Sequence, residues 1–149
     1  MKVTFLLGSN SDEDYAKKIA DVLKEFDVPS DVIVASAHKV PEKVVEEIEK
    51  INADPQPQVI ITVVGMSNGL AGVVAGGCIH PVVNCPPMET LEEYIVDLNS
   101  SLRMPSDVPV MTVLNQKNAA LAAVKILAET DESLQQKVRD HIANVKAKY

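Results

Sequence analysis

The tetrapeptide SAHK, residues 36–39, carries side chains that can do chemistry. Histidine transfers protons near neutral pH, and a lysine ammonium binds a phosphate group as a point charge. His38 is one of only three histidines in the chain, and Lys39 follows it directly. The pair therefore indicates one of two things. The two residues form a site that holds an anion and moves a proton, or they are a loop histidine that is bonded to a carbonyl and a lysine that is solvated.

The pentapeptide GSNSD, residues 8–12, offers a second set of polar groups. Gly8 permits a tight turn, and Ser9, Ser11 and Asp12 place hydroxyl groups and a carboxylate at a predicted helix start. Free amides at a helix start favour anions, and an aspartate suits the paired hydroxyls of a ribose. The alternative is a plain helix cap supplied by Ser11, and this loop by itself favours the cap.

The segment that begins GMSNG, at residue 65, is rich in glycine. Four glycines lie within or next to the helix predicted for residues 67–77: Gly69, Gly72, Gly76 and Gly77. An interior glycine costs a helix roughly 1 kcal/mol relative to alanine, so tight packing or close approach to a ligand must compensate. Ser67 and Asn68 would then form the helix start that faces the ligand. The spacing is not the G-x-G-x-x-G fingerprint of dinucleotide sites.

The other reactive side chains have simpler explanations. Arg103 is a further basic candidate for a ligand, and a surface cation at a helix end explains it equally well. His80 precedes a proline at a strand entrance and His141 lies on a charged terminal helix, so both are expected to be structural or solvated. Cys78 and Cys85 match no metal-ligand or redox spacing, which predicts reduced thiols and a cytoplasmic protein.

Strand and helix signals alternate along the whole chain. Apolar runs predict strands over residues 2–7, 31–35, 57–65, 80–86 and 108–114. Helical spacing of apolar residues, or high alanine content, predicts helices over residues 11–26, 41–51, 67–77, 88–102, 117–129 and 133–148. This alternation predicts an α/β fold: a three-layer sandwich around a doubly wound, five-stranded parallel sheet, with an extra C-terminal helix.

A flavodoxin-like strand order is the expected topology, since right-handed crossovers leave few others. In such sheets, ligands bind at the carboxyl ends of the strands. The three polar segments follow the first, second and third predicted strands. We therefore expect them to meet at one edge of the sheet.

Composition limits the classes of ligand. The 149 residues predict one domain, residues 1–149, and a hydrophobic content of 46% is enough for a substantial core. Aromatic residues are only 3%, which leaves few rings to sandwich a flavin or stack on bases. A net charge of −7 argues against binding to nucleic acid or to acidic membranes. The apolar start is too short for a signal peptide, and no run approaches transmembrane length.

Six segments together resemble the aminoimidazole ribonucleotide (AIR) carboxylases and the related carboxyaminoimidazole ribonucleotide mutases of purine biosynthesis. They are GSNSD, SAHK, SNGL, CPP, SSLRMPS and NAALAA, in the family's order and at family-like spacings. Lys39, SNGL and LRMP are similar to the class II branch, which carboxylates AIR directly with carbon dioxide and uses no ATP, biotin or metal. The class II pattern usually carries an arginine before SNGL, where this chain has Met66.

The resemblance implies a site without a cofactor and a homo-octameric assembly. His38 would move the proton. The first loop would hold the ribose, the second the 5′-phosphate, and the third would border the carboxylate pocket. The substrate-binding residues would be Gly8, Ser9, Ser11, Asp12, Ser36, Ala37, Lys39, Gly65, Met66, Ser67, Asn68 and Arg103.

The predicted function is carboxylation of 5-aminoimidazole ribonucleotide with carbon dioxide in de novo purine (IMP) biosynthesis. The product is 4-carboxy-5-aminoimidazole ribonucleotide, and the enzyme class is a carbon–carbon lyase acting in the carboxylation direction. Two alternatives stay open: a carboxyaminoimidazole ribonucleotide mutase, and a paralogue that binds the nucleotide without chemistry. A phospho-receiver is disfavoured, because GSNSD lacks the acidic pair that such a protein needs after its first strand.

Overall fold

The five strands form one parallel sheet in the order expected from the sequence. In the computed structural model, which describes residues 1–149, the strands are β1 (Lys2–Leu7), β2 (Ser30–Val34), β3 (Gln58–Val63), β4 (Val82–Asn84) and β5 (Met111–Thr112). Their order across the sheet is β2-β1-β3-β4-β5, and every neighbouring pair is parallel. This is the flavodoxin-like order, in which the winding direction reverses between β1 and β3.

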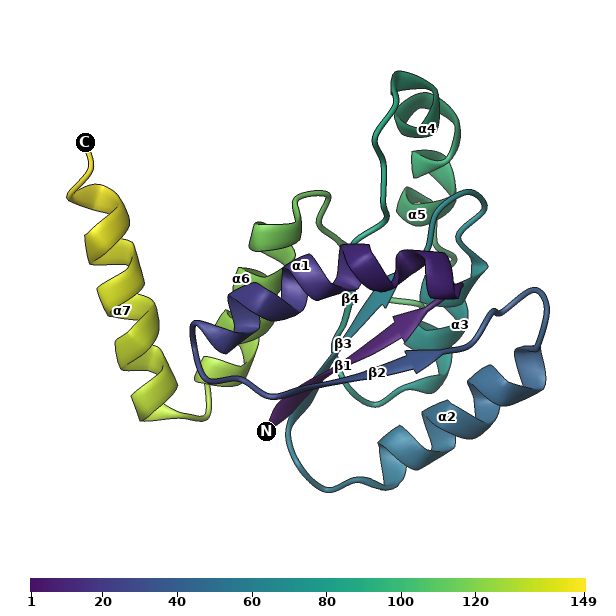
Figure 1. Ribbon diagram of the computed structural model, residues 1–149. Coiled ribbons are helices and arrows are strands. Elements are labelled where there is room, and N and C mark those ends of the chain that lie inside the picture. The colour runs from purple at the N-terminus through teal and green to yellow at the C-terminus, as the bar shows by residue number, and fades with distance from the viewer.

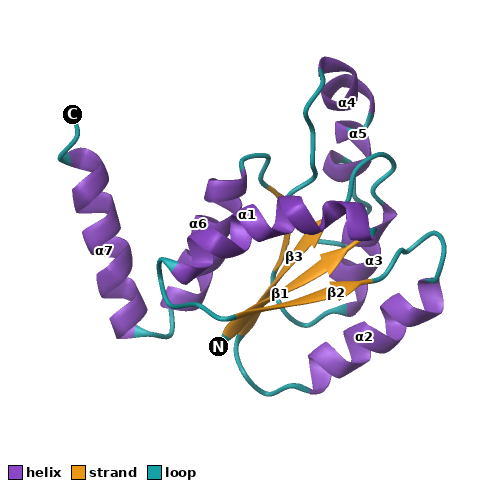
Figure 2. Ribbon diagram, in the orientation of Figure 1, coloured by secondary structure: helices purple, strands orange, loops and turns teal.

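Helices cover both faces of the sheet (Figures 1 and 2). One face carries α1 (Glu13–Lys24) and α6 (Gln116–Ala128), with α7 (Glu132–Lys146) packed against α6; the other carries α2 (Pro41–Ala53) and α3 (Gly69–Gly77). Two short helices, α4 (Leu91–Val96) and α5 (Leu98–Leu102), lie between β4 and β5 along the chain. The predicted three-layer sandwich with an extra C-terminal helix is confirmed. None of the helices combines the length and apolar character needed to cross a bilayer.

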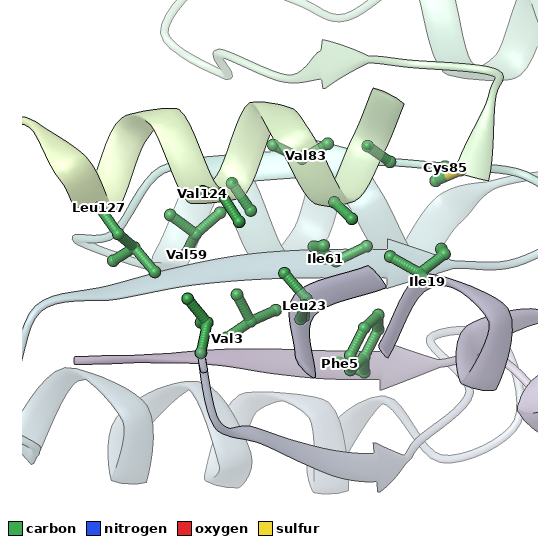
Figure 3. Close-up of a cluster of buried hydrophobic side chains, with 14 of the residues drawn as sticks. Val3, Phe5, Ile19, Leu23, Val59, Ile61, Val83, Cys85, Val124 and Leu127 are labelled. Carbon is green, nitrogen blue, oxygen red and sulfur yellow. The ribbon is translucent and has the colours of Figure 1, made fainter. Parts of the chain in front are cut away.

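Each face of the sheet has its own hydrophobic core. Phe5 of β1 belongs to the cluster under α1 and α6, whereas its neighbour Leu6 belongs to the cluster under α2 and α3. Both side chains are 0% exposed. Figure 3 shows Phe5 close to Ile19 and Leu23 of α1. A strand covered on both faces is apolar at most positions, which is why β1 and β3 lack a polar–apolar alternation. Their buried polar residues, Thr4, Gln58 and Thr62, form side-chain hydrogen bonds.

The first core depends on small residues in α6. Ala119, Ala120 and Ala123 are fully buried there, and Val124 and Leu127 fill the remaining space. Small side chains allow the helix backbone to approach the sheet closely at interior packing density. The high alanine content of this segment is therefore a packing feature as well as a helix signal.

The last helix, α7, has only one buried residue, Leu134. Lys137 holds it to the end of α1, because its Nζ donates to the Asp27 carboxylate at 2.7 Å and to the Phe26 carbonyl at 3.1 Å. The His141 ring centroid lies 5.3 Å from that of Phe26. His141 is thus half-buried in a structural contact, as predicted.

Two elements between β4 and α6 differ from their prediction. The helix expected over residues 88–102 is divided into α4 and α5, which meet at Asp97. The strand expected over residues 108–114 is reduced to Met111 and Thr112. Pro109 has no N–H group to donate to a ladder, so pairing with β4 starts only after it.

Candidate active site

The loops that follow β1, β2 and β3 begin side by side at the carboxyl edge of the sheet. In the register of the sheet, Leu7 pairs with Val34 on one side and with Val63 on the other. The pairing continues by one bond on each side, from Ala35 N to Leu7 O at 2.9 Å and from Gly8 N to Val63 O at 3.1 Å. The three polar segments are therefore neighbours, as expected.

The first loop crosses directly over the third. A Cβ atom added to Gly8 would collide with the side chain of Val64, so only glycine fits at this crossing. The same Cβ position lies 3.5 Å from Oδ2 of Asp12, which places that carboxylate beside the turn. Burial raises the pKa of Asp12, and a backbone hydrogen bond involving Ser9 opposes the shift.

Ser9, rather than Ser11, is the capping residue of this loop. Its Oγ accepts hydrogen bonds from the N–H of Ser11 at 3.3 Å and from the hydroxyl of Ser11 at 3.0 Å. It thereby caps a single 3-10 turn, η1 (Asn10–Asp12), and α1 follows without a side-chain cap of its own. The prediction of a cap at Ser11 was wrong, because the 3-10 turn moves the first free amides two residues earlier. Both serine side chains are exposed.

The second loop is a turn closed by Ser36. Its Oγ accepts from the N–H of Lys39 at 3.3 Å, and its carbonyl accepts from the N–H of Val40 at 2.9 Å. Ala37 packs against the second core, whereas His38 and Lys39 are exposed. The turn therefore presents the two candidate side chains at the edge of the sheet.

His38 lies directly on the start of α3. A Cβ atom added to Gly69 would lie 2.7 Å from Nε2 of His38, so the imidazole would have to move aside for it. The imidazole thus occupies the space that any other residue at position 69 would fill. This contact brings the SAHK and SNGL segments together and explains one of the glycines that weaken α3.

Lys43 is a further cation at this edge that no sequence motif marked. Its Nζ donates to the carbonyl of Val34, the last residue of β2, at 2.7 Å. Lys43 follows Lys39 by four residues and lies in the first turn of α2. Lys39 lies in the turn before α2, so helical spacing does not relate the two lysines, and only the bond to Val34 places Lys43 here.

The third loop is held in an unusual backbone conformation. Met66 has φ = 56°, a left-handed value that is uncommon for a residue other than glycine, and its side chain is 79% exposed. Its carbonyl accepts from the hydroxyl of Ser100 at 3.4 Å. Gly65 lies against Pro87 of the next loop, and Ser67 is exposed. Met66 and Ser67 are therefore open to a ligand at this edge.

Asn68 is buried, unlike Met66 and Ser67. Its side chain is buried, with 4% of the residue exposed, and its Oδ1 accepts from the N–H of Ala71 to cap α3 at 3.2 Å. Its Nδ2 donates to Oδ1 of Asn84 at 2.7 Å and to Oγ of Ser101 at 3.1 Å. The amide that was expected to border a ligand pocket is turned into the protein.

Arg103 ends α5 and is exposed. The segment after it packs on α3, since a Cβ atom added to Gly72 would lie 3.3 Å from Sδ of Met104. Gly72 is one turn of α3 from the glycine under His38. The structure therefore brings the backbone that carries Arg103 to the same helix that supports the histidine.

Cys85 follows β4 and is fully buried. Burial raises the pKa of its thiol to about 11, so the group stays protonated at neutral pH. The Tyr15 hydroxyl lies 3.9 Å from its sulfur and donates to the carbonyls of Pro86 and Leu114. A buried, protonated thiol is not a nucleophile. No group of three or more His, Cys, Asp or Glu side chains is arranged to hold a metal ion.

Comparison with known proteins identifies the family. The model of the family described as AIR carboxylase matches residues 2–148. The phosphoribosylaminoimidazole carboxylase of Archaeoglobus fulgidus is 44% identical over 138 residues, which cover 93% of this chain and 75% of that protein. The N5-carboxyaminoimidazole ribonucleotide mutase of Methanocaldococcus jannaschii is 37% identical over 148 residues, which cover 98% and 91%. Among animal multifunctional relatives, the match spans 29% to 33% of the relative's length.

A solved structure agrees over the same range. The crystal structure of Treponema denticola PurE superposes with a TM-score of 0.92 at 36% identity, covering 98% of this chain and 92% of that one. The matches thus include carboxylases and a mutase, and they share one fold with this protein. On this family match, on identities above 30% and on near-complete coverage, the chain belongs to the AIR carboxylase family.

Proposed function

We propose that this protein, as a single domain of residues 1–149, carboxylates aminoimidazole ribonucleotide with carbon dioxide in de novo purine biosynthesis. The observation that carries the proposal is the contact of His38 with the start of α3, beside Lys39 and at the sheet edge where the first loop also begins. Lys39 and SNGL are the features that resemble the directly carboxylating branch. The relative in Archaeoglobus fulgidus bears the name of that activity.

The reaction requires positioning and one proton transfer. The aminoimidazole ring is an enamine-like nucleophile, so its ring carbon bonds to the carbon of carbon dioxide, and an electron pair moves onto a carboxylate oxygen. The ring carbon then loses its proton and the ring regains aromaticity. His38 is the base that accepts this proton. Orientation of the two reactants and exclusion of water supply the remaining acceleration.

The surrounding loops would bind the rest of the nucleotide. Ser9 and Asp12 would hold the ribose, and Ser36 and Lys39 would hold the 5′-phosphate. Ser67 would border the new carboxylate with the exposed backbone next to Met66. The apolar Met66 in place of the usual arginine leaves this part of the site without a cation of its own.

One assay separates the three candidate functions. Purified protein is mixed either with aminoimidazole ribonucleotide and bicarbonate, or with the amine-carboxylated nucleotide, and the ring-carboxylated product is followed. Direct carboxylation predicts product from the first mixture. Product from the second mixture alone would identify a mutase. Nucleotide binding without product from either mixture would identify a non-catalytic paralogue.

Lys39→Ala is expected to weaken nucleotide binding more than turnover. A charge-assisted hydrogen bond contributes about 1.5–3 kcal/mol, so the Kd for the nucleotide should rise about 10–100-fold. Isothermal titration with the nucleotide measures the change. Lys148→Ala, at an exposed lysine in the C-terminal turn, is the control and should leave the Kd unchanged. An unchanged Kd in Lys39→Ala would remove the phosphate role.

The proposal includes assembly into a homo-octamer in the cytoplasm. Helices α4 and α5 expose several large apolar side chains: Leu91 (75%), Ile95 (64%), Val96 (61%) and Leu102 (58%). Residues 51–102 contain no lysine or arginine, and Glu89, Glu92, Glu93 and Asp97 lie beside these apolar groups. An acidic apolar surface of this kind suits a basic apolar partner surface.

A matching surface exists on the same chain. A groove of about 470 Å³ between α6 and α7 is lined by apolar side chains and by Lys117, Lys125, His141 and Lys146, with no carboxylate among them. Figure 1 shows α4 and α7 on opposite sides of the chain. The partner for each surface is therefore a second copy, joined through two different patches.

Ile95→Asp and Ile142→Asp should each lower the molecular mass measured by light scattering. Each change places a carboxylate in one half of the apolar contact, and each leaves the other half intact. An equal mixture of the two variants should therefore form dimers with one copy of each. Variants that keep the wild-type mass would exclude this contact.

A further inference from the structure

A buried polar network lies behind the third loop and joins five elements. At its centre, Oδ1 of Asn84 accepts from Nδ2 of Asn68 at 2.7 Å and from Oγ1 of Thr62 at 3.2 Å. Nδ2 of Asn68 also donates to Oγ of Ser101 at 3.1 Å. Thr112 of β5 donates to the carbonyl of Ser101 at 3.1 Å. The four side chains of Thr62, Asn68, Asn84 and Ser101 are each 4% exposed or less.

A second set of bonds attaches the network to the backbone of the loop. The hydroxyl of Ser100 accepts from the N–H of Asn68 at 3.0 Å, and it lies within hydrogen-bond distance of the carbonyls of Met66 and Asp97. Met66 sits between these attachments with its left-handed φ of 56°. Such a conformation persists only where its surroundings over-determine it. The hydrogen bonds from Ser100 of α5 and Asn84 of β4 provide that constraint.

The network bears on His38 through Gly69. Asn68 caps α3 and is anchored to Asn84, and Gly69 is the next residue, whose backbone lies against Nε2 of His38. A shift of Asn68 would therefore move the surface on which the imidazole rests. The same network holds Ser101, two residues before Arg103, so it also fixes the end of α5 from which the Arg103 segment continues.

We propose that Asn84, with Thr62 and Ser101, is a positioning residue for the active site, and that it acts on His38 through Asn68 and Gly69. Asn84 touches no ligand in this scheme; it supplies the buried acceptor that fixes the start of α3. This inference rests on the proposed function for its kinetic readout, although the position of His38 can be observed without it. The side chain of Asn68 accordingly supports the start of α3 and does not contact the ligand.

Asn84→Leu and Asn84→Asp form a matched pair that tests the role of the acceptor. Leucine has a similar size but no acceptor, so Nδ2 of Asn68 loses its shortest bond. Aspartic acid keeps an oxygen facing Asn68 and Thr62. We expect kcat to fall about 10²-fold in Asn84→Leu, with KM for the nucleotide little changed, and to recover largely in Asn84→Asp. Equal kcat values in the two variants would overturn the proposal.

Thr62→Val and Thr4→Val provide a control for stability. Both threonines are buried in adjacent strands, and each donates to a buried amide oxygen, Thr62 to Asn84 and Thr4 to Gln58 at 2.9 Å. The Thr4 bond lies at the opposite edge of the sheet. Both variants should lose a similar amount of thermal stability. Only Thr62→Val should alter kcat, and an equal loss of kcat in Thr4→Val would reduce the network to a structural role.

The imidazole resonances of His38, followed by NMR in each variant, give a readout independent of activity. They should shift in Asn84→Leu, return toward wild type in Asn84→Asp and stay unchanged in Thr4→Val. If the wild-type protein makes no product from either nucleotide, the proposed function fails, but these spectra still decide the positioning role. Unshifted His38 resonances in Asn84→Leu would refute it.

Discussion

Replacing His38 with asparagine should lower kcat by about 10²–10⁴-fold and leave the fold and most of the nucleotide affinity intact. This range is the usual contribution of a positioned general acid or base. Asparagine fills part of the space of the ring and can hydrogen-bond, but it cannot accept a proton near neutral pH. The imidazole lies exposed on the start of α3, so its removal leaves no buried cavity. Steady-state carboxylation kinetics and a thermal melt measure the two effects.

His141→Asn is the matched control for this experiment. His141 contacts Phe26 between α7 and α1, on the face of the sheet away from the SAHK turn. The control should change thermal stability slightly and leave kcat unaltered. Near-normal turnover in His38→Asn would remove the histidine from its catalytic role, and a parallel loss in His141→Asn would point to assembly rather than to proton transfer.

Phe5→Ala should lower the free energy of unfolding by about 3–5 kcal/mol. Phe5 is fully buried at the centre of β1, where α1 covers it (Figure 3). Truncation removes apolar contacts and leaves a cavity that the surrounding strands cannot collapse to fill. Total stability of a domain is about 5–15 kcal/mol, so the loss is a large share of it. Urea unfolding followed by circular dichroism measures the change.

Tyr149→Ala is the control for the removal of an aromatic ring. Tyr149 is fully exposed at the C-terminus, and its truncation should change stability by no more than about 0.5 kcal/mol. A loss below about 1 kcal/mol in Phe5→Ala would mean that the core around β1 repacks, contrary to its close-packed arrangement.

The chain's local patterns were sufficient for the architecture. Continuous apolar runs such as residues 58–63 predicted strands covered on both faces. The alternation of strands with helices predicted that these strands are parallel. The position of SAHK after a strand then predicted its place at the carboxyl edge of the sheet. These inferences succeed because burial periodicity and chain connectivity are properties of sequence, and the sheet edge follows from them by geometry.

Local sequence patterns could not predict the orientation of a side chain that bonds to residues distant in the sequence. The sequence predicted Asn68 at a helix start facing a ligand, and the structure shows that it caps α3. Only Asn84, sixteen residues away, turns its amide inward. In the same way, the region where the predicted helix divides at Asp97 is bonded to the third loop, since Ser100 contacts the carbonyls of both Asp97 and Met66.

The sequence by itself determined the sheet, its helical layers and the edge at which Ser36, His38 and Lys39 lie. Tertiary structure alone decided that His38 rests on Gly69, that Lys43 joins this edge, and that Asn68 belongs to a buried network with Asn84 and Ser101. The physical reason is the range of the forces involved. Periodic burial is encoded over a few residues, whereas a buried amide takes its orientation from whichever partners the folded chain brings within 3 Å.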